Sequence, residues 1–249
     1  MNTQTLFLAW QDKTTTRRWF PIGRLDAISQ QPRYRFRYTR GAEMAWAGAG
    51  FAALPDFPDF HKSYEANELF PMFQNRVMAE GRPEFGEYLE HLGLRPDQKD
   101  PVEILAVSGG TRVTDSFEVF PKLERGSDGT FSCRFFLHGA SHVSAAAQDR
   151  IGKLIVGERL YIALELNNPA TKLAVQVQTE DYHMIGWAPR YLLRDLAQAM
   201  QDSPGDFSAE VIRLNPLPVP SKQRLLVEFR GHWPEGHEPM SDGEFAPLV

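Results

Sequence analysis

The sequence contains a single cysteine, Cys133, among its 249 residues. No internal disulfide can form, and such a chain suits a reducing compartment. No hydrophobic run approaches the roughly 18 residues that a membrane-spanning helix needs. The first residues also lack the long apolar region of a signal peptide. We therefore expect a cytoplasmic protein that makes no membrane contact.

The sequence also lacks an excess of basic residues. Its 27 Lys and Arg face 32 Asp and Glu, which gives a net charge of -5 and a pI of about 5.8. Bulk binding to duplex nucleic acid depends on neutralising phosphates, so this composition argues against it. A local basic groove stays compatible with these numbers. The length suggests one large domain or two modest ones.

No sequence motif points to catalysis. Residues 48–53 fit a loose G-x-G-x-x-A pattern, but a dinucleotide site needs it between a strand and a helix. The Leu-Pro-Asp of residues 54–56 follows at once and would stop a helix. There is no Gly-x-Ser-x-Gly elbow. Asp56, Asp59 and His61 share one polar loop, where such crowding is common. We expect no catalytic residues, no cofactor and no enzyme activity.

Zinc binding is the remaining chemical possibility. His138 and His142 are four residues apart, and Cys133 lies five residues before His138. A helical His-x3-His pair can hold zinc, but Gly139 interrupts a helix here and no third ligand is evident. We therefore predict no metal site.

Alternation predicts a strand near the N-terminus. Tyr34, Phe36 and Tyr38 share one face, and three arginines take the other, namely Arg33, Arg35 and Arg37. This arginine face is either solvated or a contact for an acidic partner. Residues 41–60, rich in Ala, Gly and Pro, are expected to be irregular, and residues 64–80 carry apolar residues at helical spacing, Phe70 and Phe73 among them.

The N-terminal half resembles the N-terminal subdomain of HipA-type toxin kinases. The resemblance covers roughly residues 5–122 and rests on these positions: Tyr38, Leu54–Asp56, Tyr64, Glu68–Phe73, Asn75, Arg76, Arg82–Glu84, Leu92–Leu94, Gly109 and Gly110. It implies a small β-sheet with packed helices. The lysine and aspartates of a kinase core have no counterpart. Stand-alone proteins of this kind act as antitoxins in some toxin–antitoxin systems.

The most organised stretch is residues 165–190. An Asn-Asn-Pro turn at 167–169 precedes a strand-like run, Leu173–Val177, and Ala-Pro-Arg190 opens a helix with proline in its first turn. The pattern resembles the HIRAN domain, a small OB-like β-barrel module of DNA-repair helicases and many bacterial proteins. The matching positions are Asn168, Pro169, Ala174, Val175, Gly186, Pro189 and Arg190.

The HIRAN resemblance implies a set of DNA-binding residues. In the helicase member, aromatic residues sandwich the last base of a 3′ end, an aspartate reads the terminal hydroxyl and a basic residue holds phosphate. The positions carried over, together with a neighbouring lysine, are His142, Asn168, Lys172, Trp187 and Arg190. His142, Trp187 and Arg190 are alternatively packing or capping residues of the barrel.

Three departures from the family pattern concern the end-specific contacts. Ala170 replaces the second stacking tyrosine, Thr171 the hydroxyl-reading aspartate, and Ser141 a common arginine. The resemblance thus implies a retained barrel in which the contacts that recognise a 3′ end are missing or weakened.

Together these observations predict an α+β protein. A small N-terminal sheet with packed helices spans residues 1–126, a HIRAN-type small β-barrel with one or two helices spans 127–232, and a surface tail spans 233–249. The expected function is a non-enzymatic nucleic-acid-binding module for single-stranded or non-duplex DNA, or for DNA ends, in a bacterial defence or toxin–antitoxin system. The alternative is an antitoxin-like or regulatory subunit that binds a HipA-type kinase or another protein through Arg33, Arg35, Arg37, Phe70 and Phe73, with the barrel as scaffold.

Overall fold

The computed structural model describes residues 3–28, 33–169, 171–241 and 243–249. The chain divides into two compact units. The first unit comprises Met1–Leu89, Leu94–Lys122 and Met240–Val249, and the second comprises Glu90–Gly93 and Leu123–Pro239. The sequence placed the domain boundary between residues 126 and 127, a few residues after the division at 122 and 123.

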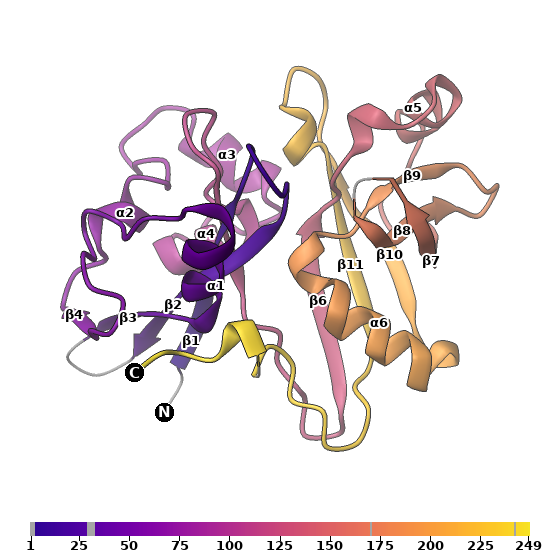
Figure 1. Cartoon of the computed structure of the whole chain (residues 1–249). Coiled ribbons are helices and arrows are strands. Elements are labelled where there is room, and N and C mark those ends of the chain that lie inside the picture. The colour runs from indigo at the N-terminus through magenta and orange to yellow at the C-terminus, as the bar shows by residue number, and fades with distance from the viewer. Residues whose placement is uncertain (1–2, 29–32, 170, 242) are drawn as a thin grey trace. The chain divides into compact units, whose positions relative to one another are not determined.

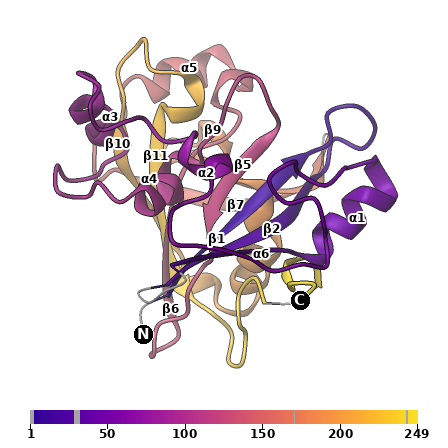
Figure 2. The same cartoon turned by 90° about the vertical axis from the view of Figure 1, so that its left-hand side faces the viewer.

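The first unit is built on a five-stranded antiparallel sheet in the order β4-β3-β2-β1-β5. Its strands are β1 (Thr3–Gln11), β2 (Trp19–Ile28), β3 (Tyr34–Tyr38), β4 (Tyr64–Ala66) and β5 (Phe117–Pro121). Its helices are α1 (Arg40–Ala49), α2 (Pro71–Gln74), α3 (Phe85–His91, whose last two residues belong to the second unit) and α4 (Pro101–Ser108), with a 3-10 turn, η5 (Gly243–Phe245). Helix α1 lies against β2 (Figure 2).

Aromatic side chains fill the core of the first unit. The Phe36 ring stacks on Phe57 with 3.9 Å between centroids, and Phe73 is fully buried beside Phe36. The Tyr38 hydroxyl donates to the Phe57 carbonyl and accepts from the Leu54 amide, both at 2.7 Å. Strand β3 confirms the predicted alternation, because its tyrosines and Phe36 are buried and its arginines are not.

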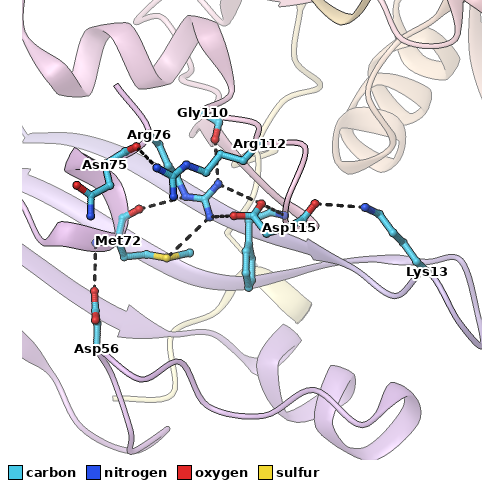
Figure 3. A network of polar contacts seen from close by, with 9 residues as sticks. Lys13, Asp56, Met72, Asn75, Arg76, Gly110, Arg112 and Asp115 are labelled. Atoms are coloured by element: carbon cyan, nitrogen blue, oxygen red, sulfur yellow. Dashed lines mark hydrogen bonds and ion pairs between the residues drawn. The ribbon is translucent and has the colours of Figure 1, made fainter. Parts of the chain in front are cut away.

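A buried ion pair ties the first unit together (Figure 3). The Arg76 guanidinium contacts the Asp115 carboxylate at 2.5 Å, donates to the Gly110 carbonyl at 2.9 Å and to the Met72 carbonyl at 3.1 Å. It also lies 5.3 Å from the centroid of the Phe117 ring. These contacts connect the segment after α2 with the loop before β5.

The second unit contains a six-stranded sheet in the order β6-β11-β10-β7-β8-β9. Its strands are β6 (Thr130–Phe136), β7 (Arg159–Asn168), β8 (Lys172–Thr179), β9 (Met184–Trp187), β10 (Ser208–Leu214) and β11 (Leu225–His232). A bridge between His138 and Trp187 joins the chain after β6 to β9. The two edges of the sheet therefore meet at one point, in a barrel-like arrangement.

Two α-helices and short 3-10 turns accompany this sheet. The helices are α5 (Ala145–Ile151) and α6 (Leu193–Asp202), and the turns are η1 (Ala140–His142), η2 (Arg190–Leu192), η3 (Pro204–Asp206) and η4 (Ser221–Gln223). Helix α6 packs against β8 (Figure 1). The predicted α+β class, with an N-terminal sheet and a small barrel-like second unit, is confirmed.

The C-terminal segment differs from the expected surface tail. Trp233 is buried and stacks on Phe131 with 4.0 Å between centroids. The last ten residues belong to the first unit, where Phe245 is buried with its ring 5.0 Å from that of Phe7. The Leu248 amide donates to the Tyr38 carbonyl at 2.9 Å. Burial of these large apolar rings explains why the segment is packed rather than solvated.

Candidate functional site

Strand register creates one solvent-facing surface on β7, β8 and β9. Ala163 pairs with Gln176 and Gln176 with Trp187, while Tyr161 pairs with Gln178 and Glu165 with Ala174. Cross-strand partners point to the same side of a sheet, and side chains alternate along each strand. We call this surface the outer face, defined by Tyr161, Ala163, Glu165, Gln176, Gln178 and Trp187. All six are exposed or half-buried, whereas Leu160, Val175, Val177 and Ile185 on the opposite side are buried.

A hydrogen-bonded network fixes the Trp187 ring on the outer face. Its indole Nε1 donates to Glu165 Oε2 at 2.6 Å, and Asn168 Nδ2 donates to the same oxygen at 2.9 Å. Asn168 Oδ1 in turn accepts from the amide and the hydroxyl of Thr171, at 3.1 and 2.9 Å. Trp187 is half-buried, so part of its ring is available to a ligand in a defined orientation.

Backbone contacts hold Trp187 from the other side. His138 and Trp187 exchange two amide-to-carbonyl hydrogen bonds of 2.9 Å. Gly139 follows with φ of 72°, and a Cβ at this glycine would lie 2.6 Å from Trp187 Cζ3. Only glycine combines this backbone conformation with such close approach of a ring. The His142 amide donates to the Gly139 carbonyl at 2.8 Å, so exposed His142 belongs to the same turn.

The two predicted basic residues flank this network in the chain. Lys172 is exposed at the start of β8, pairs with Asn168 and has φ of 68°. Arg190 opens η2, three residues after Trp187, and is half-buried. Burial lowers the pKa of the Arg190 guanidinium from its ordinary value. Ser141 is exposed within η1, and Ala170 lies outside the described residues.

Sequence reasoning missed Glu165. Its carboxylate accepts from two of the predicted site residues, Trp187 and Asn168, and places a negative charge beside the indole. The alternating run of residues 158–166 indicated a strand but not which residue of the next strand each side chain meets. The shift in register between Glu165 and Asn168 decides that.

The zinc alternative finds no support in the geometry. Among the described residues, no group of three His, Cys, Asp or Glu side chains could hold a metal ion. Cys133 lies on β6 and is buried. In the polar loop of the first unit, Asp56 accepts from the Met72 amide and Asp59 from the His61 amide, which are contacts typical of turns and helix starts.

Cys133 should be unreactive in the native protein. Burial raises the pKa of its thiol to about 12, and the thiolate is the form that attacks thiol reagents. We expect no labelling by a chromogenic disulfide reagent at neutral pH until a denaturant unfolds the second unit. Rapid labelling of native protein would contradict the burial of this side chain.

The predicted partner-binding residues are largely engaged within the first unit. Arg35 pairs with Glu65 at 2.9 Å, and Arg33 lies 3.8 Å from Asp100. Arg37 contacts Asp26 at 2.8 Å and donates to the Val249 carbonyl at 3.0 Å.

The two predicted phenylalanines differ in exposure. Phe70 is half-buried, with its ring centroid 5.0 Å from that of Phe57. The prediction for Phe73 is wrong, because this side chain has no exposed surface with which to contact a partner. Its apolar ring is used in the core instead.

Comparison with known proteins shows that part of the second unit matches a known domain family. Residues 130–232, which lie within the second unit, match the family model of the HIRAN domain. A crystal structure of a protein from Lactobacillus plantarum is similar at 21% identity, with a TM-score of 0.31, over 42% of this chain and 93% of that chain. The HIRAN domain of human HLTF is similar at 17% identity, with a TM-score of 0.30, over 43% and 84%.

No curated protein matches the chain. Within the described residues, no helix is long and apolar enough to cross a membrane. The resemblance of the first unit to HipA-type kinases stays a prediction.

Proposed function

We propose that this protein is a non-enzymatic DNA-binding module whose HIRAN domain receives single-stranded or otherwise non-duplex DNA on the outer face, around Trp187. The observation that carries the proposal is the HIRAN match together with a half-buried tryptophan held in one orientation by Glu165, whose carboxylate Asn168 holds in turn. Stacking of a base on an aromatic ring contributes about 1–3 kcal/mol. A ring whose orientation is fixed loses little freedom when a base stacks on it.

Electrostatics favour an unpaired strand over a duplex. A duplex brings phosphates on both strands, and the Glu165 carboxylate beside Trp187 repels a phosphate placed there. The chain's net charge of -5 adds to this repulsion. A single strand can stack bases on Trp187 and on the exposed His142 ring and leave its phosphates to Lys172 and Arg190 in this proposal. The family's 3′-end contacts are changed at Ala170 and Thr171, so we propose strand binding without strict dependence on a free 3′ hydroxyl.

Variants at Trp187 and Arg190 test this assignment. Trp187→Ala removes the stacking face and should weaken binding of a labelled single-stranded oligonucleotide at least about fivefold. Arg190→Ala should weaken binding and lower the dependence of log affinity on log salt, because one phosphate contact is lost. Fluorescence anisotropy over a salt series measures both effects. Trp46→Ala, which removes an exposed tryptophan of the first unit, is the control and should bind as the wild type does. Unchanged affinity in the Trp187→Ala/Arg190→Ala double variant would exclude this site.

A second candidate function is binding of a protein partner by the first unit, such as a HipA-type kinase in a toxin–antitoxin or other defence system. The observation in its favour is Trp46, which is 64% exposed on α1, with exposed Met44 on the same helix. Exposed tryptophans are frequent energetic centres of interfaces. Co-purification with such a kinase that is lost in Trp46→Ala would support this candidate, and co-purification unaffected by the substitution would count against it.

A further inference from the structure

Two exposed tyrosines lie next to each other on the second unit. The ring centroids of Tyr161 on β7 and Tyr182 in the β8–β9 turn are 5.8 Å apart. Tyr161 is 36% exposed and Tyr182 is 76% exposed. The Arg159 guanidinium lies 5.9 Å from the centroid of the Tyr161 ring. The pair therefore offers π faces to solvent with a cation beside them.

The turn holds Tyr182 in an unusual conformation. Its φ is 63°, a region that bulky residues rarely occupy, and its exposed ring gains little from burial. The Tyr182 amide donates to the Thr179 carbonyl at 2.9 Å, and Arg150 holds neighbouring Asp181 at 3.0 Å. Backbone strain at an exposed aromatic residue points to a binding role for its side chain.

The tyrosine pair continues the surface that carries Trp187. Tyr161 and Trp187 both belong to the outer face, with Gln176 and Gln178 of β8 between them. Strand rise and strand spacing separate the Tyr161 and Trp187 positions by about 12 Å. A few nucleotides of one strand cover this distance, well within the roughly 4–16 nucleotides that a small barrel of the OB type can hold.

We propose that Tyr161 and Tyr182 form a second base-stacking position for the same single DNA strand, reached after the strand leaves Trp187. The inference rests on the proposed function, because it assumes that a single DNA strand is bound at Trp187. Arg159 is placed to neutralise a phosphate beside the stacked base. The side-chain amides of Gln176 and Gln178 offer neutral hydrogen-bond donors and acceptors to the edges of bases that lie between the two stacking positions. Among the nearby acidic groups, Glu158 and Asp181 both pair with the single guanidinium of Arg150, which offsets one of their two charges.

The test compares oligothymidylates of three and twelve nucleotides, each labelled at the 5′ end. In the Tyr161→Leu/Tyr182→Leu double variant, which keeps apolar bulk but removes both π faces, affinity for the twelve-nucleotide strand should fall at least about fivefold. Affinity for the three-nucleotide strand should fall less, because so short a strand can bind at Trp187 without spanning the roughly 12 Å to the tyrosine pair. Val156→Ala removes another exposed side chain of the second unit and serves as the control, with unchanged affinity for both.

The outcomes separate the two proposals. Wild-type binding of both strands with no loss in the tyrosine variant overturns the second stacking position and leaves the proposed function standing. Failure of the wild type to bind either strand overturns both. Photo-crosslinking of the unaltered protein to a twelve-nucleotide strand carrying 5-iodouracil gives an independent result. Crosslinks to peptides containing Tyr161 or Tyr182 support the inference, and crosslinks confined to the Trp187 peptide contradict it.

Discussion

Replacing Asp115 with alanine is expected to lower the free energy of unfolding of the first unit by about 3 kcal/mol. The substitution leaves the Arg76 guanidinium, whose side chain is only 2% exposed, without its carboxylate (Figure 3). The carbonyls of Met72 and Gly110 still accept from it, but neither carries a formal charge. A buried cation without a counter-ion is among the costliest defects that one substitution can create.

The pair formed by Arg95 and Asp97 provides a matched control. Its atoms approach to 3.0 Å in the same unit, but both side chains are largely exposed. Asp97→Ala should therefore change stability by no more than about 0.5 kcal/mol. Hydrogen exchange in urea, followed in peptides of β1 and β5, measures the stability of the first unit by itself. Equal effects of the two substitutions would show that burial does not strengthen the Arg76–Asp115 pair.

Replacing Gly139 with alanine is expected to damage both stability and DNA binding in the second unit. Alanine is strained at a φ of 72°, and its Cβ would also overlap the Trp187 ring. Displacing the ring breaks the hydrogen bond from its Nε1 to Glu165 and tilts the stacking face. We expect a loss of about 2 kcal/mol from the forced repacking, beyond the backbone strain, and at least about fivefold weaker binding of single-stranded DNA.

Gly157→Ala separates these two causes. Gly157 has φ of 82°, so alanine is strained there too, but a Cβ would meet nothing within 4 Å. This variant should show the backbone cost alone and bind DNA as the wild type does. Urea denaturation followed through tryptophan fluorescence gives stability, and anisotropy gives affinity. If the two variants are equally stable and bind equally well, the close contact between Gly139 and Trp187 does not position the ring.

The sequence predicted strand β3 better than it predicted helices α1 and α2 of the first unit. The alternation of residues 34–38 identified β3 because the buried aromatic side chains and the less buried arginines alternate with the two-residue period of a strand. Residues 41–60 were expected to be irregular, yet α1 spans Arg40–Ala49. Gly41 reads as a helix breaker in a sequence, but here a Cβ would collide with the Pro21 carbonyl of β2. The glycine is required for close packing, and this contact cannot be read from local composition.

Helical spacing gave a wrong prediction for the following segment. Apolar residues between 64 and 80 predicted one helix, whereas the structure has a short strand, β4, and the four-residue α2. Phe73 is buried by packing on Phe36, which lies far away in the chain. Contacts between residues far apart in the chain also decide which residues form the site. Asn168, Trp187 and Arg190 were found from a motif, but Glu165 and Tyr161 join them only through the register of three strands.

Fluorescence anisotropy of the unaltered protein with labelled DNA tests the central proposal most directly. A single strand with a free 3′ hydroxyl, the same strand with a 3′ phosphate, and a duplex are compared over a salt series. We predict that both single strands bind with similar affinity, that binding weakens as salt rises, and that the duplex binds more weakly than either. Absence of single-strand binding at low salt would contradict a DNA-binding role for the second unit.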